Sequence, residues 1–300
     1  MVEVTVIIPT FGNPDMLENA IKSVLNQTLE ELELIIVDDN NQNSIEREQT
    51  KKIVDKYLKT DDRVKYICHE KNINGAAARN TGIKFSVGKY IAFLDSDDEF
   101  LSNRLEKCVN VLKKSSDKKI AGVYTGCEFK RDGKTYKRYK KVASGNYLVD
   151  TLACTFKFCT GSNIFMKSRV IKELHGFDET FLRHQDYEFL VRYFEQYSLA
   201  AIPEVLVIKN NQNRNLPNTK KMIEIKQQYI YKYRNIINQL SYNDRKKIYD
   251  SHNLAIAESF LLEKNRKQAK EYYQKVSIKQ RLKIKTIVRR FVFILKIMID

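Results

Sequence analysis

The chain has 300 residues, of which 43% are hydrophobic and 30% charged, and it carries a formal net charge of +16. This composition excludes a disordered chain and is typical of one large globular α/β domain, alone or with an appendage. Five cysteines without a Cys-x-x-Cys pair argue against a disulfide framework or a zinc site, and favour a reducing cytoplasm.

The positive charge is concentrated in the C-terminal part. Residues 220–300 contain 20 Lys and Arg against 7 Asp and Glu, so this part supplies +13 of the charge. Such a segment indicates a solvated helical face, contact with an anionic membrane or binding to nucleic acid. Nucleic acid is the weakest of the three, because no nucleic-acid-binding motif accompanies the charge.

The first hundred residues alternate continuous apolar runs with segments of helical spacing. The apolar runs predict strands at 4–8, 32–37, 64–68 and 90–94, and the helical spacing predicts helices at 16–25, 45–58, 75–86 and 103–113. Pro9 is expected to end the first strand, and the opening residues suit a strand better than a signal peptide. Apolar strands separated by helices predict a parallel sheet buried on both faces.

Polar residues follow three of these strands. Pro9, Thr10 and Phe11 follow the first strand, Asp38 and Asp39 the second, and Asp95-Ser96-Asp97 the fourth. Ligands of such sheets bind beyond the carboxyl ends of the strands, so these residues predict a nucleotide pocket at one edge.

The second part of the chain has a different pattern. Runs at 120–129 and 134–139 predict a hairpin around Asp132-Gly133. The remaining expected elements are strands at 159–166 and 200–208, helices from 168 and at 186–197, a linker at 210–217, and helices from 218 to 298.

The stretch YIAFLDSDDEF joins a buried strand to four acids, Asp95, Asp97, Asp98 and Glu99. An exposed turn that caps the next helix is one interpretation. A second acidic pair at a neighbouring strand end favours another interpretation, a divalent cation held by carboxylates and bound together with a diphosphate. On that interpretation Asp98 is a weaker candidate ligand that could instead cap a helix, and Asp98 and Glu99 are expected to begin a turn. No Walker sequence or GxGxxG is present, so the phosphates must be bound differently.

Four ordered stretches resemble family 2 glycosyltransferases: VTVIIPTFGN, LELIIVDDNNQN, NINGAAARNTGIKFSVGKYIAFLDSDDEF and HGFDETFLRHQDYEFLVR. The resemblance covers about residues 2–210. It implies a GT-A fold, a mostly parallel, Rossmann-like sheet that binds a nucleotide-diphospho-sugar, and inversion at the sugar. It also implies a catalytic domain at 1–215, divided into a nucleotide-binding half at 1–110 and an acceptor half at 111–215. Residues 216–300 would then form a basic helical extension.

The resemblance also implies roles for individual residues. Pro9, Thr10 and Phe11 would pack on the base and ribose, and Asp39 would accept the uracil N–H, a role that suits a pure acceptor. Arg79 would lie near the base and phosphates. The DxD-like residues would act together: Asp95 at the ribose or the metal, Ser96 at the nucleotide, and Asp97 on Mn²⁺ or Mg²⁺. Alternatives remain, since Asp39 could cap a helix and Arg79 could pair with Asp39 or Asp95.

Inverting transfer needs a general base opposite the leaving group. The resemblance assigns this role to Asp186, although Gln185 stands where the family usually has an acid. Asp186 could instead be a helix N-cap, and Glu188 is the second choice of base. Gly161-Ser162-Asn163 is expected on the acceptor side.

Residues 278–299 predict a basic amphipathic helix that suits an anionic membrane interface. The alternative is packing on its own domain or in a homodimer. Together these features predict a cytoplasmic, metal-dependent glycosyltransferase, acting at the inner face of the cell membrane. It would move a sugar from a UDP-sugar to a saccharide or lipid-linked acceptor in capsule, exopolysaccharide or lipopolysaccharide synthesis. A nucleotidyltransferase of related fold and a non-catalytic nucleotide-sugar-binding subunit are the alternatives.

Overall fold

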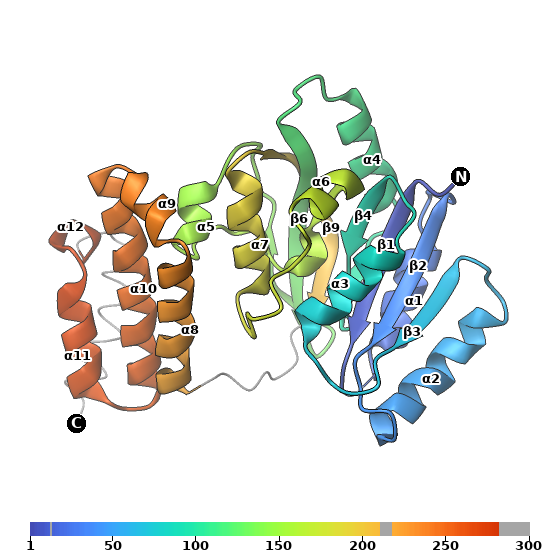
Figure 1. Cartoon of the computed structure of the whole chain (residues 1–300), viewed down its shortest axis with the longest axis horizontal. Coiled ribbons are helices and arrows are strands. Elements are labelled where there is room, and N and C mark those ends of the chain that lie inside the picture. Colours follow the sequence, from blue (N-terminus) through green and yellow to red (C-terminus); the bar gives the residue numbers. More distant parts are fainter. Residues whose placement is uncertain (13, 211–217, 282–300) are drawn as a thin grey trace. The chain divides into compact units, whose positions relative to one another are not determined.

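The computed structural model describes residues 1–12, 14–210 and 218–281 (Figure 1). Within these described ranges the chain divides into two compact units, one formed by residues up to 146 together with 157–210, and the other by residues 147–156 together with 218–281. Of the predicted linker 210–217, Asn210 is the last residue of a strand and the rest lies outside the described residues, as does most of the predicted basic amphipathic helix.

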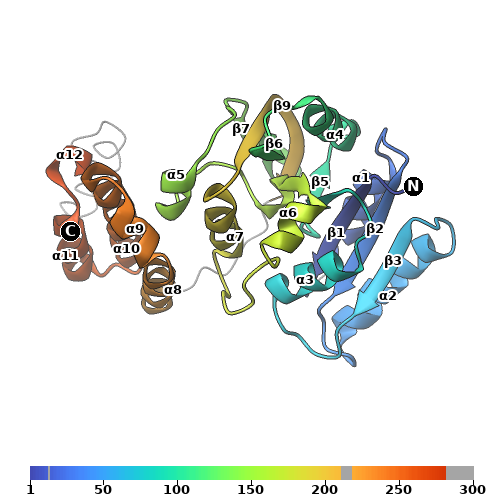
Figure 2. The ribbon, with the colours of Figure 1, turned by 45° about the horizontal axis from the view of Figure 1, so that its top comes forward.

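The first unit is built on one sheet. Among the described residues it has nine strands in the order β3-β2-β1-β4-β8-β6-β9-β5, with β7 paired to β6. Figure 2 shows β1, β2 and β3 side by side. The strands are β1 Val4–Thr10, β2 Leu32–Asp38, β3 Val64–Cys68, β4 Tyr90–Phe93, β5 Asp98–Phe100, β6 Ile120–Arg131, β7 Lys134–Tyr139, β8 Phe165–Lys167 and β9 Ser198–Asn210. β1 runs parallel to β2 and β4, and β2 parallel to β3, whereas β8 is antiparallel to both β4 and β6. The parallel first half matches the prediction.

Helices cover both faces of this sheet. The helices of the first unit are α1 Leu17–Leu25, α2 Ile45–Leu58, α3 Gly75–Phe85, α4 Arg104–Lys114, η1 Gly161–Asn163 (a 3₁₀ turn), α6 Ser168–Glu173 and α7 Gln185–Phe194. Apolar side chains of α1, α2 and α4 share one core with Val4, Val6 and Ile8 of β1. On the opposite face Gly82 of α3 packs against Ile7, since a Cβ at Gly82 would lie 2.4 Å from Ile7 Cγ2. This close packing holds α3 against β1.

Three local predictions were wrong. Of the strand expected at 159–166, residues 161–163 form the 3₁₀ turn η1 and β8 begins only at Phe165, because the buried Asn163 side chain holds the turn by donating to the Thr125 and Phe158 carbonyls. β1 continues through Pro9 to Thr10, paired with β2. The Ile7 carbonyl faces β4, because it accepts from the Leu94 N–H. Backbone groups two residues apart in a strand face the same side, so the nitrogen of Pro9 also faces β4. The pairing with β4 has already ended at Ile7, so the missing N–H of Pro9 costs no hydrogen bond between strands. Asp98 and Glu99 do not merely begin a turn. They form β5, antiparallel to β9, because Lys209 and Asn210 supply polar partners for their side chains.

The second unit is helical. Its helices are α5 Leu148–Leu152, α8 Thr219–Lys232, α9 Arg234–Gln239, α10 Tyr242–Leu262, α11 Arg266–Lys275 and α12 Ile278–Arg281. Tyr229 and His252 hold α5 in place: the Tyr229 hydroxyl donates to the Thr151 carbonyl at 2.9 Å, and His252 Nε2 lies 2.8 Å from the Leu152 carbonyl. None of the helices in the described residues combines the length and apolarity needed to span a bilayer.

Candidate functional site

The acids after β4 form a compact cluster. The chain turns at Asp95, whose carbonyl accepts from the Asp98 N–H at 2.9 Å. One carboxylate oxygen each from Asp95, Asp97 and Asp98 lies within 4.8 Å of the others. Carboxylates this close repel one another, so each needs positive charge or hydrogen-bond donors nearby.

Lys209 pairs with the buried member of this cluster. Asp98 lies opposite Lys209 in the β5–β9 ladder, and Lys209 Nζ is 3.2 Å from Asp98 Oδ2 and 3.3 Å from Oδ1. The Ser162 hydroxyl also donates to Asp98 Oδ2 at 2.6 Å. Burial raises the pKa of the Asp98 carboxyl to about 7, and the attraction of Lys209 opposes only part of this shift. Asp98 is therefore engaged by its own chain, and it caps no helix.

Asp95 is held from three directions. Arg79 Nη2 donates to Asp95 Oδ1 at 2.7 Å, and the Thr160 hydroxyl donates to Oδ2 at 3.0 Å. The Asp95 N–H donates to Ser162 Oγ at 2.9 Å. Ser162 thus connects Asp95 with Asp98, which fixes the spacing of the two acids.

Arg79 links the acid cluster to α7. Its Nη1 donates to Gln185 Oε1 at 3.2 Å, at the start of α7, while Nη2 pairs with Asp95. Gly75 makes room for this contact, because a Cβ there would lie 3.1 Å from Arg79 Nη1 and 3.4 Å from Gln185 Oε1. The Arg79–Asp95 pair anticipated as an alternative is present. Gln185 brings an amide rather than a carboxylate to Arg79.

The donor set suits a hard divalent cation. Asp95 and Asp97 both line the cavity beyond the ends of β1, β2 and β4. Carboxylate oxygens are the ligands that Mg²⁺ and Mn²⁺ prefer. Asp98 is a poor ligand here because Lys209, Ser162 and the Asn210 N–H already occupy its oxygens. The residues that fit a metal are therefore Asp97 and Asp95.

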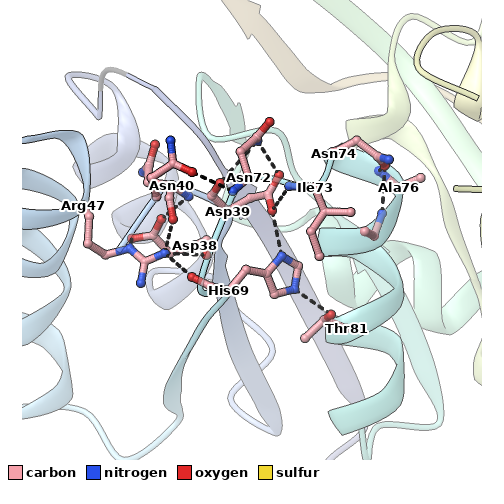
Figure 3. Close-up of polar contacts among 12 residues, drawn as sticks. Asp38, Asp39, Asn40, Arg47, His69, Asn72, Ile73, Asn74, Ala76 and Thr81 are labelled. Atoms are coloured by element: carbon pink, nitrogen blue, oxygen red, sulfur yellow. Dashed lines mark hydrogen bonds and ion pairs between the residues drawn. The ribbon is translucent and has the colours of Figure 1, made fainter. Parts of the chain in front are cut away.

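At the end of β2, Asp38 organises the loop that follows (Figure 3). Its Oδ1 accepts from the Asn40 N–H at 2.9 Å, and Arg47 Nε lies 3.0 Å from Oδ2. The Tyr66 hydroxyl also donates to Oδ2. These contacts make Asp38 a structural residue of this loop.

Asp39 points the other way, toward the loop before α3 (Figure 3). His69 Nδ1 lies 2.7 Å from Asp39 Oδ1, which also accepts from the Ile73 N–H at 3.0 Å. Asn72 Nδ2 donates to Oδ2 at 2.8 Å. Asp39 caps no helix, because α2 and α3 are capped by the side chains of Ser44 and Asn74. Its carboxylate is held in one orientation, with His69 in turn 2.8 Å from Thr81 Oγ1.

A cavity of about 600 Å³ joins these elements beyond the ends of β1, β2 and β4. Its lining residues are Pro9, Thr10, Phe11, Met16, Asp39, Asn72, Asn74, Gly75, Ala78, Arg79, Asp95, Ser96 and Asp97. Every residue predicted for nucleotide or metal binding lines this cavity. Phe11 is 61% exposed, so its ring is open to contact with a bound molecule.

Asp186, the predicted base, does not line this cavity, but it lies close enough to Arg79, Asp95 and Lys209 to be affected by their charges. It is the second residue of α7 rather than its N-cap, which is His184. A Cβ added to Gly161 would lie 2.7 Å from Asp186 Oδ1. This oxygen is shielded from solvent, although Asp186 as a whole is partly exposed. Burial raises the pKa of the Asp186 carboxyl, Arg79 and Lys209 lower it, and Asp95 adds to the rise. A base with a raised pKa binds a proton more readily.

Sequence analysis did not identify three residues that hold the acids: Thr160, Ser162 and Lys209. Lys209 follows the predicted strand 200–208 directly, but nothing in the sequence pairs it with an acid 111 residues away. Ser162 and Asn163, expected on the acceptor side, are fully buried and act as supports. Asn163 Nδ2 donates to the Thr125 carbonyl at 2.7 Å.

Comparison with known sequences identifies the protein family. The sequence profile described as "Glycosyl transferase family 2" matches residues 5–175. The chain is 31% identical over 241 residues to an uncharacterized glycosyltransferase of Methanocaldococcus jannaschii, and the match covers 77% of each chain. It is 29% identical over 189 residues to the GalNAc(5)-diNAcBac-PP-undecaprenol beta-1,3-glucosyltransferase of Campylobacter jejuni, covering 60% of this chain and 58% of that one.

A third relative is the amylovoran biosynthesis glycosyltransferase AmsB of Erwinia amylovora, 26% identical over 193 residues, with 63% of this chain and 62% of that one covered. The match therefore spans about three fifths of the Campylobacter and Erwinia proteins.

Solved structures agree on the fold. TarS 1–349 from S. aureus, in complex with UDP-GlcNAc, aligns with a TM-score of 0.59 at 15% identity, covering 93% of this chain and 92% of that one. The mannosyltransferase PcManGT from Pyrobaculum calidifontis, in complex with GDP-Man and Mn²⁺, aligns with a TM-score of 0.58 at 17% identity, covering 90% and 73%. The GT-A fold predicted from the sequence is confirmed.

Proposed function

Because this chain belongs to glycosyl transferase family 2, we propose that it moves a sugar from a UDP-sugar to a glycan or lipid-linked acceptor in capsule, exopolysaccharide or lipopolysaccharide assembly. The general reaction, transfer of a sugar from a nucleotide-sugar, follows from membership of the family. One observation carries the assignment of the site: Arg79 donates to both Asp95 and Gln185. A single side chain thus joins the donor acids to the helix that holds Asp186.

The donor binds in the cavity beyond β1, β2 and β4. Pro9, Thr10 and Phe11 pack against the base and ribose, and Asp39 receives the uracil N–H while His69, Asn72 and Ile73 fix its carboxylate. The TarS complexes with UDP and UDP-GlcNAc support a UDP-sugar donor. The complex of PcManGT with GDP-Man makes a GDP-sugar the competing candidate for the donor.

Asp97, together with Asp95, would hold a Mn²⁺ or Mg²⁺ ion at the donor diphosphate. The bound cation would offset the negative charge that builds up on the leaving nucleotide. Arg79 and Lys209 offset part of the negative charge of Asp95 and hold its carboxylate in position. The Mn²⁺ bound in PcManGT supports the choice of metal.

Asp186 serves as the general base. It takes the proton from the acceptor hydroxyl as that oxygen bonds to the sugar carbon and the bond to the diphosphate breaks, which inverts the anomeric centre. The buried surroundings that raise the pKa of Asp186 favour proton uptake. Gly161 brings the 3₁₀ turn against this carboxylate and so limits its orientation.

The proposal also assigns a role to each part of the chain. Residues 1–215 form the catalytic domain, with a nucleotide-binding half at 1–110 and an acceptor half at 111–215, and residues 216–300 form a basic helical region. Residues 278–299 hold the protein at the inner face of the cell membrane, near a lipid-linked acceptor, and formation of a homodimer is the competing role for this segment.

Substitution of the base and of the metal ligand tests these assignments separately. Asp186→Asn keeps the shape of the side chain but cannot accept the proton, so transfer should fall by a factor on the order of 10²–10⁴ while UDP binding persists. Asp97→Ala should instead abolish the dependence of UDP binding on Mn²⁺, as measured by calorimetry. Transfer at an unchanged rate in Asp186→Asn would show that another group is the base.

A further inference from the structure

The hairpin of β6 and β7 carries a concentration of positive charge outside the donor cavity. Residues 130–141 contain seven Lys and Arg and a single acid, Asp132. β7 pairs only with β6 within the described sheet, and residues 131–138 are all exposed. We define this surface, residues 129–141 together with Lys157, as the basic hairpin.

Aromatic rings alternate with these cations. Phe129 contacts both Tyr136 and Tyr139, with ring centroids 6.2 Å apart for Phe129–Tyr136 and 5.6 Å apart for Phe129–Tyr139. Arg131 lies 5.4 Å from the Tyr136 ring, and Lys137 lies 4.6 Å from the Tyr139 ring. Cations over ring faces stiffen such a surface without neutralising its charge.

The chain itself neutralises little of this charge. Among the described residues, the carboxylate ion pair found within 130–141 joins Arg138 Nε to Glu128 Oε2 at 2.6 Å. Glu128 is also bound by the Thr135 hydroxyl. The other six basic side chains of 130–141 create a positive potential that attracts an anion.

The basic hairpin lies next to the segment that supports the catalytic site. Lys157 Nζ is 5.6 Å from the Tyr139 ring. Three residues further along the chain, the Thr160 hydroxyl donates to Asp95, and Gly161 lies against Asp186. Lys157 of the basic hairpin is therefore only four positions along the chain from Gly161, the residue that lies against the proposed base.

We propose that the basic hairpin binds a negatively charged stretch of the glycan acceptor, one that carries carboxylates or phosphodiesters. This proposal rests on the proposed glycosyltransferase function and adds the charge class of its acceptor. Lys and Arg pair with the anionic groups, and the exposed Tyr136 offers an apolar surface to a sugar ring. Insertion into a membrane is disfavoured, because Tyr136 is the only large hydrophobic side chain exposed within 130–141.

The test uses the full chain and a defined probe, fluorescein-labelled oligogalacturonate, with a neutral maltooligosaccharide of equal length for comparison. The variant Arg131→Gln/Lys137→Gln/Lys157→Gln removes three charges from the basic hairpin. The matched control, Lys52→Gln/Lys59→Gln/Lys118→Gln, removes three exposed charges elsewhere. Phosphatidylglycerol vesicles provide the lipid arm, and UDP affinity is measured for each protein.

We expect the wild-type protein to bind oligogalacturonate but not the neutral glycan, and the hairpin variant to bind it at least tenfold more weakly. The control variant should stay within about twofold of wild type, and all three proteins should bind UDP equally. No binding of oligogalacturonate, or equal weakening in the control, would overturn the proposal. Loss of vesicle binding without loss of glycan binding would assign the surface to lipid. Failure of the wild-type protein to bind UDP would instead overturn the proposed function, and with it the acceptor role.

Discussion

Lys209 gives the acid cluster an internal counter-charge that sequence analysis missed. The sequence predicts a divalent cation bound with a diphosphate as the partner of these acids, rather than a side chain alone. In the structure Lys209 Nζ lies 3.2 Å from Asp98 and 3.8 Å from Asp95, while Arg79 donates to Asp95. The protein thus balances Asp98 and part of the charge on Asp95 itself, and the proposed metal acts mainly through Asp97.

Removal of Lys209 should expose the strength of this pair. Lys209→Met leaves Asp98 buried without its cation, which should lower the free energy of unfolding at pH 8 by about 3–5 kcal/mol. The double variant Lys209→Met/Asp98→Asn removes the orphaned charge and should recover most of that loss. Urea denaturation measures both. If Lys209→Met is as stable as wild type, the pair does not hold β5 to β9.

At the scale of single elements, the sequence predicts what local pattern determines. The apolar runs of β1, β2 and β4 and the spacing of α2 specify their own structure. β5 could not be predicted, because DEF is a strand only through pairing with β9. The position of Asp39 and Asp97 on one cavity followed from strand order, whereas the supports Ser162 and Lys209 depend on contacts between distant segments.

The 3₁₀ turn at Gly161 offers a test of how Asp186 is placed. A Cβ on residue 161 would lie 2.7 Å from Asp186 Oδ1, so Gly161→Ala must displace the carboxylate. We expect kcat for transfer to fall roughly 10- to 100-fold, because small misplacements of a catalytic group are costly. UDP affinity should not change. Full activity in this variant would mean that the contact does not orient Asp186.

α8 and α10 contain a pH-sensitive contact. His252 is buried, with Nε2 at the Leu152 carbonyl and Nδ1 3.5 Å from Lys226 Nζ. Burial, with the nearby Lys226 charge, lowers the pKa of His252 to about 4, whereas the unfolded chain titrates near 6.5. Between these values the unfolded state binds the extra proton, so stability should decline as pH falls from about 6.5 to 4, by about 3 kcal/mol in total.

Urea denaturation at several pH values measures this loss. His252→Gln keeps a donor for the Leu152 carbonyl but does not titrate, so its stability should depend less steeply on pH over that range. Equal pH dependence in the variant and the wild-type protein would assign the loss to other groups.

At the scale of the whole molecule, the chain contains a unit with the GT-A fold and a helical unit that incorporates residues 147–156. The resemblance seen in the sequence ends at about residue 210, so the sequence gives less guidance for the helices after that point. The charge asymmetry indicated a separate basic region, but it could not reveal that α5 packs with α8 and α10, because that depends on Tyr229 and His252 reaching backbone carbonyls.

Donor choice is the most direct test of the account. Purified protein is incubated with a panel of UDP- and GDP-sugars, with and without Mn²⁺, and release of the nucleoside diphosphate is measured for wild type and Asp97→Ala. The account predicts that at least one UDP-sugar is turned over, that Mn²⁺ is required, and that Asp97→Ala is inactive. Turnover of a GDP-sugar alone, or metal-independent turnover that survives Asp97→Ala, would contradict it.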